Sequence, residues 1–347
     1  MFRTITGSLR DAGHRVQEVY GEDPYDLDSE TWGLPLSGPR TRYKVPLPSS
    51  IWSMTGSLGR ALACLRRAKP DVVYVHYVWI NAVYFALLKP FFGYALVLGL
   101  RGSDINRPGV TARAFPLLFR AADRVIAISE DLKALALRYG ADARRVEVVY
   151  NGADIGWWQR ADAEVERDPK RIVFVGRLET VKGPDVLLEA FGRIAGASPE
   201  ASLLLVGGGS LEESLRERAA SLGLDERIAF CGPQDHQRIK EQLYRASVLA
   251  FPSRSEGFGL AMLEGMATGL PVAASNVGAI PEVLDGGGLL VPADDPDALA
   301  EALLRLLRDP DERDRLGRTA RQRAETFSMT SCTAAYERVL TDAAERR

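Results

Sequence analysis

Two acidic residues, Glu256 and Glu264, flank the start of a predicted helix and have the chemistry to serve a binding or catalytic site. They are separated by seven residues in the stretch SEGFGLAMLEGMATGLPVAAS, whose helix is predicted to begin near Leu260. Glu256 precedes the helix and Glu264 lies one turn inside it, so the carboxylates do not stack on one face. Two separate roles are therefore favoured over a carboxylate dyad. The alternative is structural, with Glu256 complementing the helix dipole and Glu264 exposed.

The neighbours of these glutamates favour a ligand site. The helix is nearly all apolar, which predicts that Glu264 lies in a cleft or is paired. Gly257 and Gly259 permit close approach of a ligand to the backbone. Because N–H groups at a helix start are unpaired and carry the positive end of the dipole, they attract phosphate.

Two basic residues, Arg177 and Lys182, occupy a loop between a strand and a helix in FVGRLETVKGPDVLLEAF. Pro184 suits the first turn of that helix. A guanidinium binds phosphate oxygens in a bidentate manner and an ammonium adds a compact charge, so the pair suits a diphosphate leaving group. Taken alone, the loop is better explained as a basic surface loop, because such loops are common.

Other turn residues carry weaker signals. The glycine run 207–209 either approaches a ligand or makes a tight turn, and Ser210 is predicted to cap the next helix. Glycines 286–288 are interpreted as a turn. Asp295 and Asp309 each precede a proline and are interpreted as helix caps rather than metal ligands, so no metal is predicted.

These residues are positioned by short apolar strands that alternate with helical stretches. The predicted strands cover 71–77, 94–100, 124–129, 145–150, 171–176, 202–207, 227–232, 247–253 and 270–275. Predicted helices include 183–196, 210–223 and 296–316. This alternation predicts an α/β fold with parallel sheets covered on both faces, in two doubly wound domains joined through the polar segment 151–170. Ligands in such folds bind at the carboxyl ends of the strands, here in a cleft between the domains.

Charge is distributed unevenly over the 347 residues, although the net charge is only −2. Residues 35–120 hold 12 lysines and arginines against 2 acidic residues, whereas residues 151–347 hold 24 against 32. The first half thus offers a cationic face for phosphate groups or an anionic membrane surface. Peripheral membrane attachment is predicted there, and a cationic cleft wall with buried aromatics is the alternative. The aromatic residues concerned are Trp52, Trp79, Phe91 and Phe92.

The sequence predicts a cytoplasmic protein without a membrane span. The apolar region 72–100 is predicted to be broken at Lys89-Pro90 and Gly93 into pieces shorter than the ~20 residues that a span needs. Residues 1–10 are polar and carry two arginines, unlike a signal peptide. The three cysteines, at positions 64, 231 and 332, indicate neither a disulfide framework nor a zinc site.

Several motifs together resemble the retaining GT-B glycosyltransferases of family 4. They are GRLETVKG, LLLVGGGS, RIAFCG, FPSRSEGFGLAMLEGMATGLPVAAS, VGAIPEVL and GLLVP. Their combination, order and spacing are specific, although no single motif is. The resemblance implies a GT-B fold of two Rossmann-like domains, with an acceptor-binding domain over 1–152 and a donor-binding domain over 153–325. A C-terminal helix over 326–347 would cross back to the first domain.

The resemblance also implies roles for individual residues. Arg177 and Lys182 would hold the donor diphosphate and stabilise the charge that leaves with it. Glu256 would face the donor sugar hydroxyls, and Glu264 would accept hydrogen bonds from the ribose hydroxyls. The further donor-binding residues would be Gly176, Gly207, Gly208, Gly232, Pro233, Gly257, Phe258, Gly259 and Leu260.

The implied activity is retaining, metal-independent hexosyl transfer from a UDP- or GDP-linked sugar, without a cofactor. The acceptor would be a glycan or glycolipid in cell-surface polysaccharide biosynthesis. The reaction would be a front-face attack through an oxocarbenium-like state, with the phosphate accepting the acceptor proton. The implied partners are the nucleotide sugar and the acceptor, and not nucleic acid. The charge of the first half adds an anionic surface on the inner face of the plasma membrane as a further expected partner.

The chain departs from the family pattern at its start. The family begins with a strand and a glycine-rich loop, whereas MFRTITGSLRDAGHRVQEV already resembles the first helix and the strand after it. Two interpretations follow: either the start of the sequence is truncated or misassigned, or the N-terminal domain is shortened. The alternative function is a pseudoenzyme that binds nucleotide sugar with impaired transfer.

A second departure concerns the acceptor side. Many family members have His-Gly after the strand equivalent to 94–100, but here Arg101, a glycine, a serine and Asp104 follow it. Arg101 would stabilise charge or bind an anionic acceptor. His76, Arg101 and Asp104 are the acceptor-side candidates, and a core or cleft-lining role explains His76 equally well.

Overall fold

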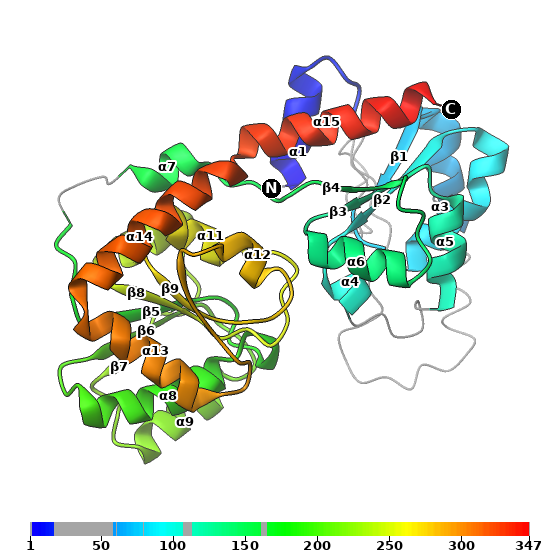
Figure 1. Ribbon diagram of the computed structural model, residues 1–347. Coiled ribbons are helices and arrows are strands. Elements are labelled where there is room, and N and C mark those ends of the chain that lie inside the picture. The colour runs from blue at the N-terminus through cyan, green and yellow to red at the C-terminus, as the bar shows by residue number, and fades with distance from the viewer. Residues whose placement is uncertain are drawn as a thin grey trace. The chain divides into compact units, whose positions relative to one another are not determined.

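The computed structural model describes residues 2–16, 58–59, 61–78, 80–106, 113–160 and 165–346. The chain divides into two compact units, one of Met1–Tyr150 with Cys332–Arg347 and one of Asn151–Ser331. Each unit contains a parallel sheet flanked by helices (Figure 1). The predicted α/β class with two parallel sheets is confirmed.

Within its described residues, the first unit has a four-stranded parallel sheet in the order β1-β2-β3-β4. Its strands are β1 (Val72–Val75), β2 (Ala95–Leu100), β3 (Arg124–Ala127) and β4 (Val146–Val148). Its helices are α1 (Phe2–Asp11), α3 (Ile80–Phe92), α4 (Ser103–Asn106), α5 (Phe115–Ala121), α6 (Glu130–Arg138) and most of α15 (Met329–Glu345). Every residue of β2 is buried, as a strand covered on both faces requires.

The C-terminal helix and the first helix share one core with the sheet of this unit. Tyr336 and Val339 of α15 are fully buried beside Ile5 of α1, with Val97 of β2 and Ile126 of β3. The predicted first helix is confirmed as α1. Of the strand predicted after it, Arg15 and Val16 are not in a strand, and the remaining residues, 17–19, lie outside the described residues.

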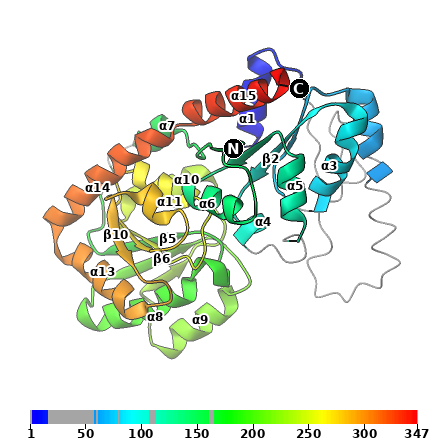
Figure 2. The same cartoon turned by 45° about the vertical axis from the view of Figure 1, so that its right-hand side comes forward.

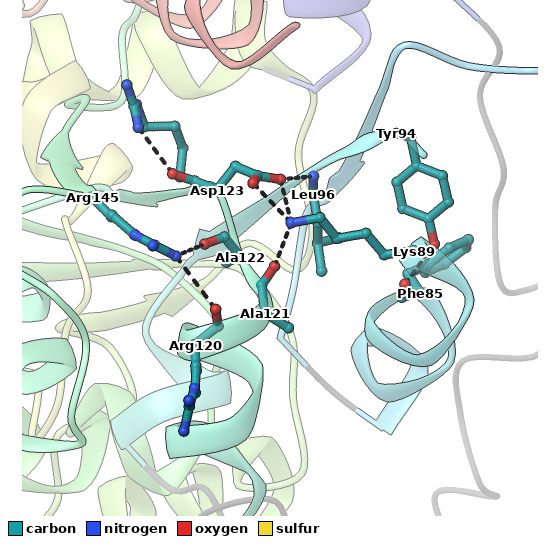
Figure 3. A network of polar contacts seen from close by, with 10 residues as sticks. Phe85, Lys89, Tyr94, Leu96, Arg120, Ala121, Ala122, Asp123 and Arg145 are labelled. Atoms are coloured by element: carbon teal, nitrogen blue, oxygen red, sulfur yellow. Dashed lines mark hydrogen bonds and ion pairs between the residues drawn. The ribbon is translucent and has the colours of Figure 1, made fainter. Parts of the chain in front are cut away.

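Helix α3 runs through Pro90, so the predicted break at Lys89-Pro90 is wrong. The proline removes one backbone hydrogen bond close to the end of the helix, and the Gly93 N–H closes the last turn by donating to the Lys89 carbonyl at 2.9 Å. The Lys89 ammonium also donates to the Ala121 carbonyl and to Asp123, each at 2.8 Å (Figure 3). These bonds anchor α3 to the end of α5. Within the described part of the chain, no helix is long and apolar enough to cross a bilayer.

The second unit has a six-stranded parallel sheet in the order β10-β9-β8-β5-β6-β7. Its strands are β5 (Arg171–Val175), β6 (Ser202–Val206), β7 (Ile228–Phe230), β8 (Val248–Phe251), β9 (Val272–Ser275) and β10 (Gly288–Val291). The first five match predicted strands, whereas β10 was predicted only as a turn. Gly288 belongs to the strand because it pairs with Val272 of β9, and a Cβ there would lie 2.0 Å from the Val272 carbonyl oxygen, so only glycine fits.

Helices cover both faces of this sheet. Figure 1 shows α8, α9 and α13 on one side and α11 and α12 on the other, and α10 lies with α11 in the turned view of Figure 2. The α-helices are α7 (Ile155–Gln159), α8 (Pro184–Ala197), α9 (Glu212–Ser221), α10 (His236–Arg245), α11 (Leu260–Ala267), α12 (Ile280–Leu284), α13 (Pro296–Arg308) and α14 (Pro310–Ala324). The 3₁₀ turns are η2 (Thr180–Lys182) and η3 (Glu325–Phe327).

Two helix predictions need correction. The stretch 296–316 forms two helices rather than one, because Asp309 ends α13 and caps α14 by accepting a hydrogen bond from the Glu312 N–H. Ser210 does not cap α9, which begins at Glu212; its hydroxyl donates to Glu179 at 2.7 Å instead. The predicted caps at Asp295 and Asp309 are both confirmed.

Candidate functional site

The candidate donor site lies in the second unit, where the strand order of the sheet reverses. From β5 the chain proceeds through β6 and β7 in one direction, and it then returns to place β8, β9 and β10 on the other side. Strands β5 and β8 are neighbours, with Ile172 paired to Val248. Loops that leave neighbouring strands in opposite directions open a crevice at their carboxyl ends, which is where open α/β sheets bind ligands.

Lys182 and Glu256 meet at this point. Lys182 follows β5 and Glu256 follows β8, and the Lys182 ammonium donates a hydrogen bond to Oε2 of Glu256. Their side chains are only 20% and 13% exposed. The ammonium also lies 5.8 Å from the centre of the Phe251 ring. Sequence reasoning gave the two residues separate roles, whereas the structure places them in direct contact.

Arg177 is the exposed basic residue at the carboxyl end of β5. Its guanidinium makes no hydrogen bond or ion pair with any residue that the structure describes. Near it, Glu179 is held by the backbone N–H and the hydroxyl of Ser210, which lower the pKa of that carboxyl. The five donors of the Arg177 guanidinium are therefore available for an anion.

The predicted donor-binding glycines gather at the ends of β5, β6 and β7. Gly207 has φ +135° and donates to the Gly232 carbonyl at 2.9 Å, and a Cβ on it would lie 1.9 Å from the Gly176 carbonyl oxygen. Gly208 packs against the ring of Pro233. The three loops thus approach one another with a closeness that side chains would prevent.

The start of α11 also has the predicted geometry. The helix begins at Leu260, and Gly259 precedes it with φ +92° and no side-chain cap. The first-turn N–H groups are left for a ligand or solvent. Phe258 is buried in edge contact with Phe327, with ring centres 5.5 Å apart, and Gly257 is buried beside it. This packing fixes the helix start relative to the crevice.

Glu264 lies among apolar residues of α11. Its carboxylate makes no hydrogen bond or ion pair with the residues that the structure describes, and burial raises its pKa to about 7. Of the two predicted situations, a cleft or a partner, the partner is not found within the described chain, and the position in a cleft stays a prediction. Such a group accepts its strongest hydrogen bonds from hydroxyls when it is ionised.

Arg254 is a residue of this region that sequence reasoning missed. Its guanidinium binds Asp185 through two hydrogen bonds, of 2.8 and 2.7 Å, and also binds Asp294. The hydrogen bonds to Asp185 contribute most to raising the pKa of Arg254. The only signal in the sequence was its position two residues before Glu256.

Of the acceptor-side candidates, Arg101 and His76 meet in the first unit. The Arg101 guanidinium contacts the Tyr74 hydroxyl at 3.0 Å and His76 Nδ1 at 2.9 Å, and it lies 5.6 Å from the centre of the Tyr336 ring. Burial and the nearby Arg101 cation lower the pKa of His76 to about 2. His76 is therefore neutral near pH 7, so it can accept a hydrogen bond but cannot supply an imidazolium.

Asp104, the third candidate, has a structural environment. Its buried carboxylate accepts hydrogen bonds from the backbone N–H groups of Val78, Arg101 and Gly102, at 2.9 to 3.3 Å. It orders the loop after β2. Among the described residues, no group of three or more His, Cys, Asp or Glu side chains is placed to hold a metal ion.

Family models match both parts of the chain. Residues 1–157 match the model described as Glycosyltransferase Family 4, and residues 157–323 match Glycosyl transferases group 1. A D-inositol 3-phosphate glycosyltransferase of Nocardioides sp. is 32% identical over 321 residues, which cover 82% of this chain and 70% of that protein. The protein of the same name from Corynebacterium glutamicum is 30% identical, over 86% of this chain and 78% of its own length.

Solved structures share the fold. Sucrose-phosphate synthase from Thermosynechococcus elongatus has a TM-score of 0.81 at 25% identity, over 100% of this chain and 93% of that one. Anabaena HepE in complex with UDP and glucose has a TM-score of 0.72 at 22% identity, over 82% of each chain.

Proposed function

Because the chain belongs to glycosyltransferase family 4, we propose that it transfers a hexosyl group from a nucleotide-diphosphate sugar to an acceptor hydroxyl, with retention of anomeric configuration. The observation that carries this proposal is the contact between Lys182 and Glu256 at the reversal of strand order between β5 and β8. A cation and a carboxylate meet there at the carboxyl ends of the strands, where the phosphates and the sugar of a donor would bind.

The geometry supports a division of tasks along the donor. The available Arg177 guanidinium and the Lys182 ammonium would stabilise the negative charge that develops on the leaving diphosphate. Glu256, next to Lys182, would accept hydrogen bonds from the sugar hydroxyls. Glu264, deeper on α11, would accept from the ribose hydroxyls. The proposed reaction uses neither a metal nor a cofactor, because the two basic residues supply the charge.

A UDP-linked donor is our first choice, and a GDP-linked donor is the alternative. The support is that HepE, which shares the fold, has been solved with UDP-glucose and with UDP and glucose. The backbone groups around Gly207 and Gly232 would surround the base. A uracil is the smaller ligand for loops that already pack this closely.

The acceptor has two candidates with different support. The names of the relatives support D-inositol 3-phosphate or a similar phosphorylated polyol, and the cationic Arg101 cluster in the first unit fits a phosphate. A lipid-linked glycan of cell-surface polysaccharide biosynthesis is supported by the apolar side chains that helices α3 and α5 expose. Phe91 is 82% exposed, Leu117 72% and Leu87 63%.

We further propose that these side chains attach the protein to the cytoplasmic face of an anionic membrane. Arg113 and Arg120 are exposed at either end of α5, and Asp123, an acidic residue nearby, is neutralised by Lys89 (Figure 3). Apolar and basic side chains together favour an anionic bilayer surface. Phe92 is half-buried, and the other two aromatic residues predicted for this surface, Trp52 and Trp79, lie outside the described residues.

A thermal-shift screen against UDP-, GDP- and ADP-sugars, followed by transfer assays with both acceptor classes, tests the function. A donor at 100 times its Kd is expected to stabilise the protein by about 2.7 kcal/mol. Stabilisation and transfer by one nucleotide class would support the proposal. Stabilisation without transfer to either acceptor class would favour the nucleotide-sugar-binding pseudoenzyme, and no stabilisation by any donor would reject the proposed donor site.

A further inference from the structure

The two loops that carry Lys182 and Glu256 are joined by one side chain, that of Arg254. The first loop, residues 180–183, belongs to the connection after β5, and the second, residues 252–259, follows β8. The sheet holds the two strands side by side, but the loops extend beyond it. A separate set of contacts must therefore fix the loops relative to one another.

Arg254 uses its side chain and its backbone for this purpose. Nη1 donates to the Thr180 carbonyl at 2.5 Å and to Asp185 Oδ1 at 2.8 Å, and Nη2 donates to Asp185 Oδ2 at 2.7 Å. Nε donates to Asp294 Oδ1 at 2.5 Å, and the backbone N–H donates to the Val181 carbonyl at 2.9 Å. Four of the five N–H donors of the guanidinium are thus in use.

The partners of Arg254 come from two connections of the sheet, the one after β5 and the one after β10. Thr180 and Val181 immediately precede Lys182, and Asp185 lies at the start of α8. Asp294 lies in the loop between β10 and α13 and has φ +58°. Arg254 itself is two residues from Glu256. Its contacts therefore fix the loop that carries Lys182 relative to the loop that carries Glu256.

Backbone packing at the same place leaves little alternative to this arrangement. Gly183 has φ +67°, and a Cβ on it would lie 2.1 Å from the Pro252 carbonyl oxygen. The two loops thus touch directly at Gly183, the residue that follows Lys182, whereas Thr180 precedes Lys182. A planar guanidinium with bidentate geometry fixes orientation as well as distance, which an ammonium does not.

We infer that Arg254 is a positioning residue, which holds the Lys182 ammonium in register with the Glu256 carboxylate so that both meet the same donor. This inference rests on the proposed function. Asp185 and Asp294 are 45% and 58% exposed, so the ion pairs contribute little to global stability, and the main effect of Arg254 is on geometry. A displacement of about 1 Å at a reacting group reduces turnover by about 100-fold.

The test compares Arg254→Gln with Arg218→Gln in the full-length protein. Arg218 makes a similar bidentate pair with Glu189, between α9 and α8 and outside the candidate site. Arg254→Gln is expected to lower kcat by about 10- to 100-fold with donor KM changed less than about threefold, and with the melting temperature close to that of Arg218→Gln. Arg254→Lys, which keeps the charge but lacks the fork, is expected not to restore kcat.

A double-variant cycle separates positioning from simple loss of stability. The single variant Asp185→Asn and the double variant Asp185→Asn/Arg254→Gln are each expected to lower kcat about as much as Arg254→Gln alone. The reason is that the two residues act as a unit, so removing the second adds no further loss. The inference would be overturned if Arg254→Gln had the same kcat as the wild-type protein. It would also be overturned if the fold loss of kcat in the double variant equalled the product of the losses in the two single variants. A wild-type protein without transfer activity would instead reject the proposed function, so the two failures are distinguishable.

Discussion

The ammonium of Lys182 donates a hydrogen bond to the carboxylate of Glu256, a residue 74 positions further along the chain. The contact exists because β5 and β8, which are not consecutive in the sequence, are neighbours in the sheet. It places a partly buried cation beside a partly buried acceptor. A donor diphosphate would therefore meet a lysine whose orientation is already fixed, without the loss of side-chain freedom that a mobile lysine would suffer.

Replacement of Lys182 with Ala is expected to lower kcat for sugar transfer by about 100- to 1,000-fold, the usual effect of removing one preorganised donor that stabilises developing charge. Glu256→Gln is expected to have a similar effect by weakening the hold on the sugar and on Lys182. Steady-state kinetics with the donor identified in the thermal screen provide the measurement. Lys170→Ala is the control, because Lys170 is paired with exposed Glu200 outside the crevice. Unchanged kcat in both site variants would remove the proposed site.

The raised pKa of Glu264 predicts that donor affinity increases with pH. The carboxyl has a pKa of about 7 in the protein, and its ionised form accepts stronger hydrogen bonds from ribose hydroxyls than its protonated form does. The ionised fraction rises from about one tenth at pH 6 to about nine tenths at pH 8. UDP is therefore expected to bind about tenfold more tightly at pH 8 than at pH 6, as measured by calorimetry.

Glu264→Gln distinguishes this effect from the titration of UDP itself. The amide cannot ionise, so the variant is expected to lose the part of the pH dependence that comes from Glu264. Glu200→Gln, at an exposed site, is expected to keep it. If wild type and Glu264→Gln show the same pH profile, Glu264 does not contact the nucleotide.

Much of this site was predictable because its signals are local. The continuous apolar runs predicted strands β5, β6, β7, β8 and β9. Gly259 predicted the start of α11 at Leu260. Each of these features depends on residues within about one helical turn or one strand of each other.

The features that sequence reasoning missed depend on which strands become neighbours. Gly288 lies in β10 because it pairs with Val272 of the adjacent strand β9, and no local pattern distinguishes that glycine from a turn glycine. The Lys182–Glu256 contact and the bonds of Arg254 also need the order of the strands. Similarly, the sequence did not show that Lys89 anchors α3, because its partner Asp123 is distant in the sequence and lies beside it only in the folded chain.

Gly207 provides a test of the close packing of the nucleotide loops. Gly207→Ala is expected to lower the free energy of unfolding by at least about 2 kcal/mol more than Gly223→Ala, because its Cβ would overlap backbone atoms of Gly176. Gly223 is a matched control: it also has positive φ, +67°, but nothing lies within 4 Å of the added Cβ. Urea unfolding of both variants gives the comparison. Equal losses would show that the loops separate without cost.

The exposed apolar side chains of α3 and α5 predict membrane binding that depends on both salt and Phe91. The protein is expected to float with anionic vesicles at low salt and to dissociate at high salt, because salt screens Arg113 and Arg120. Phe91→Ser is expected to weaken partitioning by about tenfold or more, since burying a phenyl ring is worth about 1.5–3 kcal/mol. Leu222→Ser, at an exposed leucine of the second unit, is the control. Because neutral vesicles attract no basic side chains, binding to them should be weaker. The prediction is wrong if the wild-type protein stays in solution with anionic vesicles at low salt, in which case the apolar face of α3 and α5 has another partner.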